Sequence, residues 1–128
     1  MKNRESFIKV LCILEGFKVI AKEFHWMENS SHQHELLDSC GEQLLKFQDT
    51  FAEQGTTIWG KITQGDLVAI RPVIPSEDVY FDSLIEFITG VSEAITKNNV
   101  KNQLSGLQNL TDEFISAVRR LIYLGDMD

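Results

Sequence analysis

The chain has few cysteines and no apolar run as long as the roughly 18 residues that a membrane-spanning helix needs, which excludes a membrane span. Its two cysteines, Cys12 and Cys40, lack the spacing of a disulfide scaffold or of a cysteine metal motif. We therefore expect free, buried thiols in a reducing compartment, and a cytoplasmic protein. The apolar start of the chain is interrupted by Lys9, Glu15 and Lys18 and has no small-residue cleavage site, so it predicts a helix rather than a signal peptide.

Several common catalytic and binding motifs are also absent. There is no glycine-rich phosphate loop, no C-x-x-C pair, and no serine or cysteine nucleophile with a histidine at a known spacing. Basic residues are outnumbered, because 12 lysines and arginines face 19 aspartates and glutamates, and the formal net charge is -7. A negative surface repels the phosphates of nucleic acids, so strong DNA binding is not expected.

Apolar residues recur at helical spacing through most of the 128 residues and predict one all-α domain, residues 1–128. The first helix is expected over residues 6–27. The second begins at Ser31 or His32 and is expected to end before Gly55. Ser76 offers an N-cap for a third helix that reaches about Lys97.

The fourth helix is expected to open at Asn98 or Asn99 and to stop at Gly125. Both prolines, Pro72 and Pro75, fall in the connection between the second and third helices, which has at most a short helical turn of its own near residues 56–67. Two helical hairpins joined by one long crossover form the ferritin-like version of a four-helix bundle.

Residues 25–53 form the most informative stretch, because they carry histidines and carboxylates of the kinds that bind iron. On a helical wheel that starts at His34, Asp38 lies about 40° round the axis, Asp49 about 60° and Glu53 about 100°. These four side chains share one face. The stripe expected to pack in the core lies on a different arc, about 220° to 320° from His34, and consists of Leu37, Cys40, Leu44, Phe47, Gln48 and Phe51.

The two ends of this polar face are too far apart to serve one metal site within a subunit. About 15 residues separate the His34/Asp38 pair from the Asp49/Glu53 pair, or roughly 22 Å along a helix. If a second copy packs antiparallel about a two-fold axis, unlike ends meet and every contact is made twice. We therefore predict two equivalent metal sites per dimer, with His25 joining at the His34 end.

A simpler interpretation treats these residues as ordinary surface and core. One His-x3-Asp pair on a helix is commonly an exposed ion pair, and Trp26 by itself is more typical of a core residue. His32 has no ligand partner at the helical spacing and is expected to be a solvated loop residue. Five candidate ligands at matching offsets, on a face separate from the apolar stripe, favour the metal site.

The pattern His25-Trp26 followed by His34, Asp38, Asp49 and Glu53, or HW then H-x3-D-x10-D-x3-E, resembles the ferroxidase-centre motif of the mini-ferritins known as Dps proteins. The resemblance is specific over residues 20–55. In the last helix the chain resembles the family only in its overall residue pattern. The gap from His25 to His34 is shorter than in the family, through a deletion in the loop. The ordinary ferritin Glu-x-x-His pattern is absent, which favours a site between subunits.

The resemblance implies that each intersubunit site binds two iron(II) ions and that hydrogen peroxide or dioxygen oxidises them. It also implies a hollow shell of twelve subunits. His25, His34 and Asp38 would come from one subunit, and Asp49 and Glu53 from its partner. Trp26 would intercept radical oxidising equivalents. Zinc or manganese suits the same ligands. The alternative is a ferritin-like structural or interaction protein without iron turnover.

Overall fold

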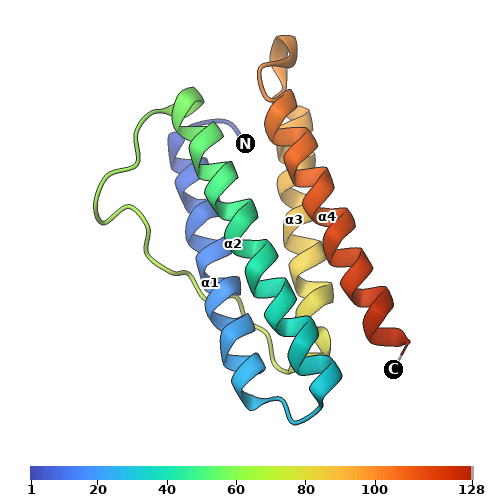
Figure 1. The fold of residues 1–128 in the computed structure, drawn as a ribbon. Helices are drawn as coiled ribbons and strands as arrows, with labels where there is room; N and C mark the ends of the chain where they lie inside the picture. The colour runs from blue at the N-terminus through green and yellow to red at the C-terminus, as the bar shows by residue number, and fades with distance from the viewer. Residues whose placement is uncertain (128) are drawn as a thin grey trace.

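The computed structural model describes residues 1–127, which form helices and connections without any strand (Figure 1). The helices are α1 Arg4–Met27, α2 Ser31–Trp59, η1 Glu77–Val79, α3 Tyr80–Lys97, η2 Val100–Asn102 and α4 Ser105–Asp126, where η marks a short 3-10 helix. The prediction of an all-α fold with four helices is confirmed. None of these helices is both long enough and apolar enough to cross a membrane.

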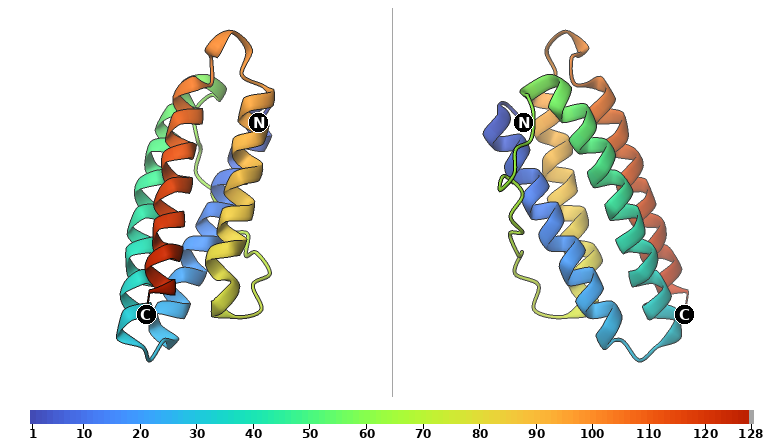
Figure 2. Two further views of the ribbon diagram at one scale, coloured as in Figure 1. Left: turned by 90° about the vertical axis from the view of Figure 1, so that its right-hand side faces the viewer. Right: turned by 60° about the vertical axis from the view of Figure 1, so that its left-hand side comes forward.

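The four long helices lie side by side in two antiparallel pairs, α1 with α2 and α3 with α4 (Figure 2). α2 also packs along α4, where the rings of Phe47 and Phe114 stack with centroids 4.4 Å apart. On the other side, Phe17 of α1 contacts Tyr80 and Phe87 of α3 at 6.0 Å and 5.4 Å between centroids. One apolar core therefore joins both pairs.

The outward face of α2 follows from its apolar stripe. Every member of the predicted stripe is buried: Leu37, Cys40, Leu44, Phe47, Gln48 and Phe51. Full burial of one large apolar side chain contributes roughly 1.5–3 kcal/mol, so this face fixes how α2 is rotated. Asp38, Asp49 and Glu53 are consequently exposed on the opposite side.

The predicted end of the second helix at Gly55 is wrong, because α2 continues to Trp59 and stops at Gly60, whose φ is 102°. Gly55 is a packing position. A Cβ atom at Gly55 would lie 2.0 Å from a ring carbon of Phe7, which is fully buried in α1. The close approach of α1 and α2 therefore requires glycine here, and the helix continues past it.

The predicted start of the fourth helix at Asn98 or Asn99 is also wrong, since α4 begins at Ser105. Lys101 and Asn102 have φ values of 53° and 61°, in the left-handed region that interrupts a right-handed helix. The side chain of Asn99 accepts a hydrogen bond from the backbone N–H of Leu104 at 2.7 Å. Asn99 thus closes a loop before the helix.

Residues 60–76 follow the surface of α1 without forming a helix of their own (Figure 2). Asp66 forms an ion pair with Arg4 at 2.6 Å, and Arg71 forms one with Glu23 at 2.6 Å. Between these two pairs, the N–H of Ile70 donates to the carbonyl of Cys12 at 3.0 Å. The segment is therefore attached near the start, the middle and the end of α1.

Both cysteines are free and buried, as predicted. Burial raises the pKa of the Cys40 thiol to about 12, although a hydrogen bond with Tyr80 acts in the opposite direction. A thiol with so high a pKa is almost never a thiolate, so Cys40 is chemically inert.

Candidate metal centre

A tight turn of residues 28–30 joins α1 to α2 and brings their ends together. The hydroxyl of Ser30 caps α2 by accepting a hydrogen bond from the N–H of Gln33 at 3.4 Å. The N–H of Ser30 donates to Glu28 Oε1 at 2.7 Å. Because the turn is short and capped on both sides, the last turn of α1 lies beside the first turns of α2.

His25 and His34 face each other across this turn. Their ring centroids are 3.6 Å apart, and their ring planes meet at 30°. His25 Nδ1 lies 3.0 Å from the carbonyl oxygen of His34. A carbonyl can only accept, so Nδ1 carries the hydrogen and Nε2 of neutral His25 keeps its lone pair. Metal-binding histidines are oriented in this way, by a hydrogen bond from the nitrogen that does not bind the metal.

A surface cavity of about 590 Å³ between α1 and α2 holds both His25 and Asp38. Asp38 follows His34 by one helical turn on an unbroken helix, and its side chain is exposed. His25 is half-buried. His34, which stacks on His25, lines a separate cavity of about 320 Å³ at the α1–α2 turn. The structure therefore places two of the five predicted ligands, His25 and Asp38, on the wall of the groove, with His34 behind His25; imidazole and carboxylate are ligand types that suit iron, manganese or zinc.

Asp49 and Glu53 stand at the other end of the outward face of α2, and both are exposed. Asp49 lines a separate cavity of about 310 Å³. Because α2 is continuous from Ser31 to Trp59, the predicted separation of roughly 22 Å along its axis applies. Over residues 1–127, no three histidine, cysteine, aspartate or glutamate side chains form a group that could hold a metal ion.

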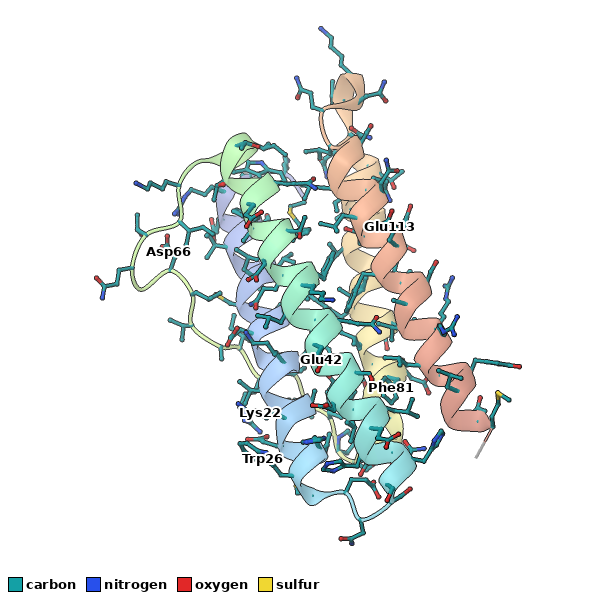
Figure 3. All side chains as sticks on the ribbon, in the orientation of Figure 1. Lys22, Trp26, Glu42, Asp66, Phe81 and Glu113 are labelled. Carbon is teal, nitrogen blue, oxygen red and sulfur yellow. The ribbon has the colours of Figure 1, made fainter. Side chains whose placement is uncertain are left out.

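The expectation that Trp26 packs as a core residue is wrong, because 69% of its surface is exposed. The ring lies on the wall of the 590 Å³ cavity, and Lys22 Nζ is 5.5 Å from its centroid (Figure 3). Helix α1 turns Trp26 away from the apolar core, which sequence spacing alone did not reveal. Its predicted role beside the site stays a prediction.

The expectation that His32 is a solvated loop residue is also wrong. His32 lies in the first turn of α2, is half-buried, and has Nε2 2.9 Å from the carbonyl oxygen of Leu124. The last carbonyls of a helix lack partners within the helix, and His32 supplies one at the end of α4. The two residues are 92 positions apart in the sequence, so no local pattern could have indicated the contact.

A polar network in the middle of the groove was not predicted. Lys18 Nζ lies 2.8 Å from Glu15 Oε1 and 3.0 Å from Gln48 Oε1. Gln48 Nε2 donates to Glu15 Oε1 at 3.0 Å and to the carbonyl of Leu11 at 3.3 Å. The buried amide of Gln48 is thus fully engaged, and its position in the apolar stripe was the one signal of this role.

Two carboxyl groups share a proton at the turn end of the bundle. Burial, the hydrogen bond with Glu28, and the charges of Glu28 and Asp78 raise the pKa of Glu77 to about 7. The hydrogen bond from Glu77, followed by the one from the Ser30 N–H, lowers the pKa of Glu28. A carboxyl group with a pKa of about 7 is protonated at lower pH, where Glu77 would donate to ionised Glu28 and connect the α1–α2 turn to the start of α3.

This pair gives stability a definite pH dependence. The folded pKa of Glu77 exceeds its ordinary value of 4.5, so its contribution is present at low pH and is lost as pH rises through about 7. We expect Glu77→Gln, which keeps a hydrogen-bond donor, to stabilise the protein above pH 7 by about 1 kcal/mol, or about 4 °C in Tm, after allowance for solvent screening. The gain should shrink as pH falls from about 7 toward 5, and it should vanish only below the ordinary pKa of 4.5.

Thermal unfolding of both proteins between pH 5 and pH 8 measures this effect. Asp82→Asn is the matched control, because Asp82 lines the same cavity as Glu77 but is exposed. An equal gain from Glu77→Gln at both ends of the range would contradict the shared proton.

Comparison of the chain with protein-family models, with curated proteins and with solved structures gives no match. Inferences about function therefore depend on the side chains and their geometry.

Proposed function

We propose that the chain is the subunit of a Dps-like protein that oxidises and stores iron, with the oxidation site shared between two copies related by a two-fold axis. His25, His34 and Asp38 of one copy would bind iron(II) together with Asp49 and Glu53 of the other. Such a face-to-face pair of α1/α2 grooves would make two equivalent sites. Zinc and manganese are the alternative metals, and elemental analysis of metal-loaded protein distinguishes them.

The observation that carries this proposal is the orientation of His25. Its Nδ1 is occupied by the carbonyl of His34 at 3.0 Å, which leaves Nε2 as the free donor atom at the end of a groove that also holds Asp38. The second carboxylate pair, Asp49 and Glu53, is exposed on the same outward face of α2. The proposed ligands are divided between the two ends of one groove. An antiparallel partner would bring the missing ligands to each end.

The chemistry requires balanced electron and proton transfer. Each of two iron(II) ions gives one electron to hydrogen peroxide, the O–O bond breaks, and two protons complete two water molecules. Carboxylates favour the product because they hold iron(III) more strongly than iron(II). Dioxygen is the alternative oxidant. Exposed Trp26, beside the site, would intercept one-electron oxidants that escape this two-electron reaction.

The proposal extends to topology and assembly. α2 and α3 run in the same direction in Figure 1, and the segment that connects them, residues 60–76, runs back along the outside of α1. This arrangement supports a ferritin-like bundle with a long crossover. In such a protein the dimers would assemble into a hollow shell of twelve subunits. Light scattering tests this, since a particle of dimer mass would limit the proposal to the two-fold site.

Anaerobic addition of iron(II), followed by hydrogen peroxide, tests the oxidation directly. We expect wild-type protein to form a ferric product, measured by its ferric-oxo absorbance, with two iron(II) consumed per peroxide. The double variant His34→Ala, Asp38→Ala should oxidise iron at least about 100-fold more slowly, because loss of even one supporting group of a metal site costs 10- to 100-fold.

Glu35→Ala is the matched control, because Glu35 is an exposed carboxylate next to His34 that is not a proposed ligand. It should oxidise iron at the wild-type rate. Equal rates in the wild type and the double variant would reject the ferroxidase and favour the alternative, a ferritin-like structural or interaction protein.

A further inference from the structure

The segment between α2 and α3 contains a stretch, residues 66–71, that is attached to α1 along one edge (Figure 2). The N–H of Val68 donates to Cys12 Sγ at 3.4 Å, and the N–H of Ile70 donates to the carbonyl of Cys12 at 3.0 Å. Cys12 Sγ in turn donates to the carbonyl of Asp66 at 3.2 Å. Every second residue therefore turns its backbone polar groups toward α1, which is the period of an extended strand.

Further contacts with α1 fix this stretch in place. Asp66 and Arg71, at its two ends, each form an ion pair with a residue of α1 at 2.6 Å. In the middle the backbone lies so close to α1 that a Cβ atom at Gly16 would be 1.9 Å from the carbonyl oxygen of Ile70. The strand is thus held in position before any partner arrives, which lowers the entropy cost of pairing with one.

The edge of the stretch that points away from α1 is free. The N–H groups of Leu67, Ala69 and Arg71, which alternate with the residues bonded to α1, donate no hydrogen bond within residues 1–127. Pro72, which has no N–H, falls on the α1 side of this alternation, so it removes no donor from the free edge. A row of unpaired N–H and C=O groups is a template on which a further strand can pair.

The side chains of the stretch are apolar and exposed. Leu67, Val68 and Ile70 are 46%, 63% and 43% exposed, and Ala69 between them is also exposed. Single exposed apolar residues are common on soluble proteins, whereas a contiguous run of them indicates a contact surface. The free edge therefore combines unpaired backbone groups with apolar side chains that a partner would cover.

The stretch is complementary to a second copy of itself. A two-fold axis through Ala69 makes two copies antiparallel and sets the free N–H groups of one opposite the free carbonyls of the other. Val68 then lies opposite Ile70 of the second copy, and this pair occurs twice. Both side chains are β-branched, the type that packs well on paired strands. Leu67 lies opposite Arg71, whose aliphatic stem can cover it.

We propose that residues 67–71 dock a second copy of this chain, as a two-stranded antiparallel ladder centred on Ala69. The inference goes beyond the proposed iron chemistry, because the ladder consists of backbone hydrogen bonds and apolar contacts and needs no metal. Asp66 and Leu67 line the 310 Å³ cavity that also holds Asp49, so the ladder borders the α1/α2 groove. Figure 3 shows Asp66 on the outside of the bundle, where a second copy has access.

Disulfide crosslinking tests the register, in full-length protein freed of metal by a chelator and oxidised with diamide. Ala69→Cys should form a covalent dimer, because opposed Cα atoms of a hydrogen-bonded pair lie about 5.5 Å apart. Val68→Cys and Ile70→Cys should not crosslink singly, because each residue lies about 8 Å from its own copy, beyond the reach of a disulfide. A mixture of these two variants should crosslink.

The wild type is the control for background oxidation, since both of its cysteines are buried and should form no crosslink. No covalent dimer of Ale69→Cys would overturn the proposal, and so would equal crosslinking of all three single variants. Because no metal is present, these outcomes leave the iron site untested by design, and loss of iron oxidation with the crosslinks intact would reject only that site.

Sedimentation of metal-free protein tests the affinity. Val68→Lys would place a charge opposite Ile70 of the second copy, and it should weaken self-association at least about tenfold. Val100→Lys is the matched control, because Val100 is likewise 63% exposed but lies in the connection between α3 and α4. It should leave self-association unchanged. A monomeric wild type, or equal association of the wild type and Val68→Lys, would overturn the strand pairing.

Discussion

We expect a mixture of two inactive variants to recover about one quarter of the wild-type rate of iron oxidation. One variant lacks His34 and Asp38, and the other lacks Asp49 and Glu53. Neither can form an intact site as a homodimer, because each dimer lacks the same end of both sites. In a heterodimer the intact ends meet at one site, and the missing ends meet at the other.

The expected recovery follows from random pairing. If the subunits exchange freely, half of the dimers are heterodimers, and each has one intact site of two, so about one quarter of all sites work. The structure makes the test informative, because His34 and Asp49 lie on one continuous helix that cannot bend its two ends together. Recovery would therefore require a second copy.

The measurement is the initial rate of ferric absorbance after the two variants are unfolded together, refolded and loaded with iron(II). A variant lacking all four residues is the control, since mixing it with either of the two double variants should recover no activity. Activity in the homodimer that lacks Asp49 and Glu53 would show that His25, His34 and Asp38 suffice within one subunit. That result would reject the shared site.

The parts of the fold that the sequence predicted are those set by local periodicity. The stripe from Leu37 to Phe51 is buried as expected, because apolar spacing of three and four residues leaves one face for a core. The outward position of Asp38, Asp49 and Glu53 follows from the same rotation of α2.

The parts that the sequence did not predict depend on contacts between distant segments. His32 is held by Leu124, and no nearby residue indicates this. Trp26 is exposed because α1 presents a different face to the core, although tryptophan is more often buried. The contact between Lys22 and Trp26 could have been predicted from helical spacing, since residues four apart on a helix are neighbours. The partner subunit stays a prediction for the same reason, because local periodicity does not show how two copies of the chain contact each other.

We expect Gly55→Ala to destabilise the protein by about 2–3 kcal/mol, which would lower Tm by about 10 °C. The added Cβ would lie 2.0 Å from a ring carbon of Phe7. That ring is fully buried, and its centroid is 5.2 Å from that of Trp59 and 5.9 Å from that of Phe51. The ring cannot retreat, so α1 and α2 must separate near the Phe7 end. Urea and thermal unfolding measure the loss.

Gly41→Ala is the matched control, because Gly41 lies on the same helix and nothing outside the helix approaches its Cβ position within 4 Å. Alanine there should stabilise the helix by up to about 1 kcal/mol, the ordinary difference between alanine and glycine. The double variant Phe7→Leu, Gly55→Ala should lose less than the sum of its two single variants, because a smaller side chain makes room for the methyl group.

The comparison separates two roles that glycine can have in a helix. If Gly55 were a stop signal, alanine would lengthen or strengthen α2, and both glycine variants would be stabilised. If Gly55 is a contact position, alanine must cost stability at Gly55 while it stabilises at Gly41, and only the change at Gly55 should be relieved by Phe7→Leu. Opposite signs at two glycines of one helix would locate the effect in the packing of α1 against α2, the pair of helices that carries the proposed site.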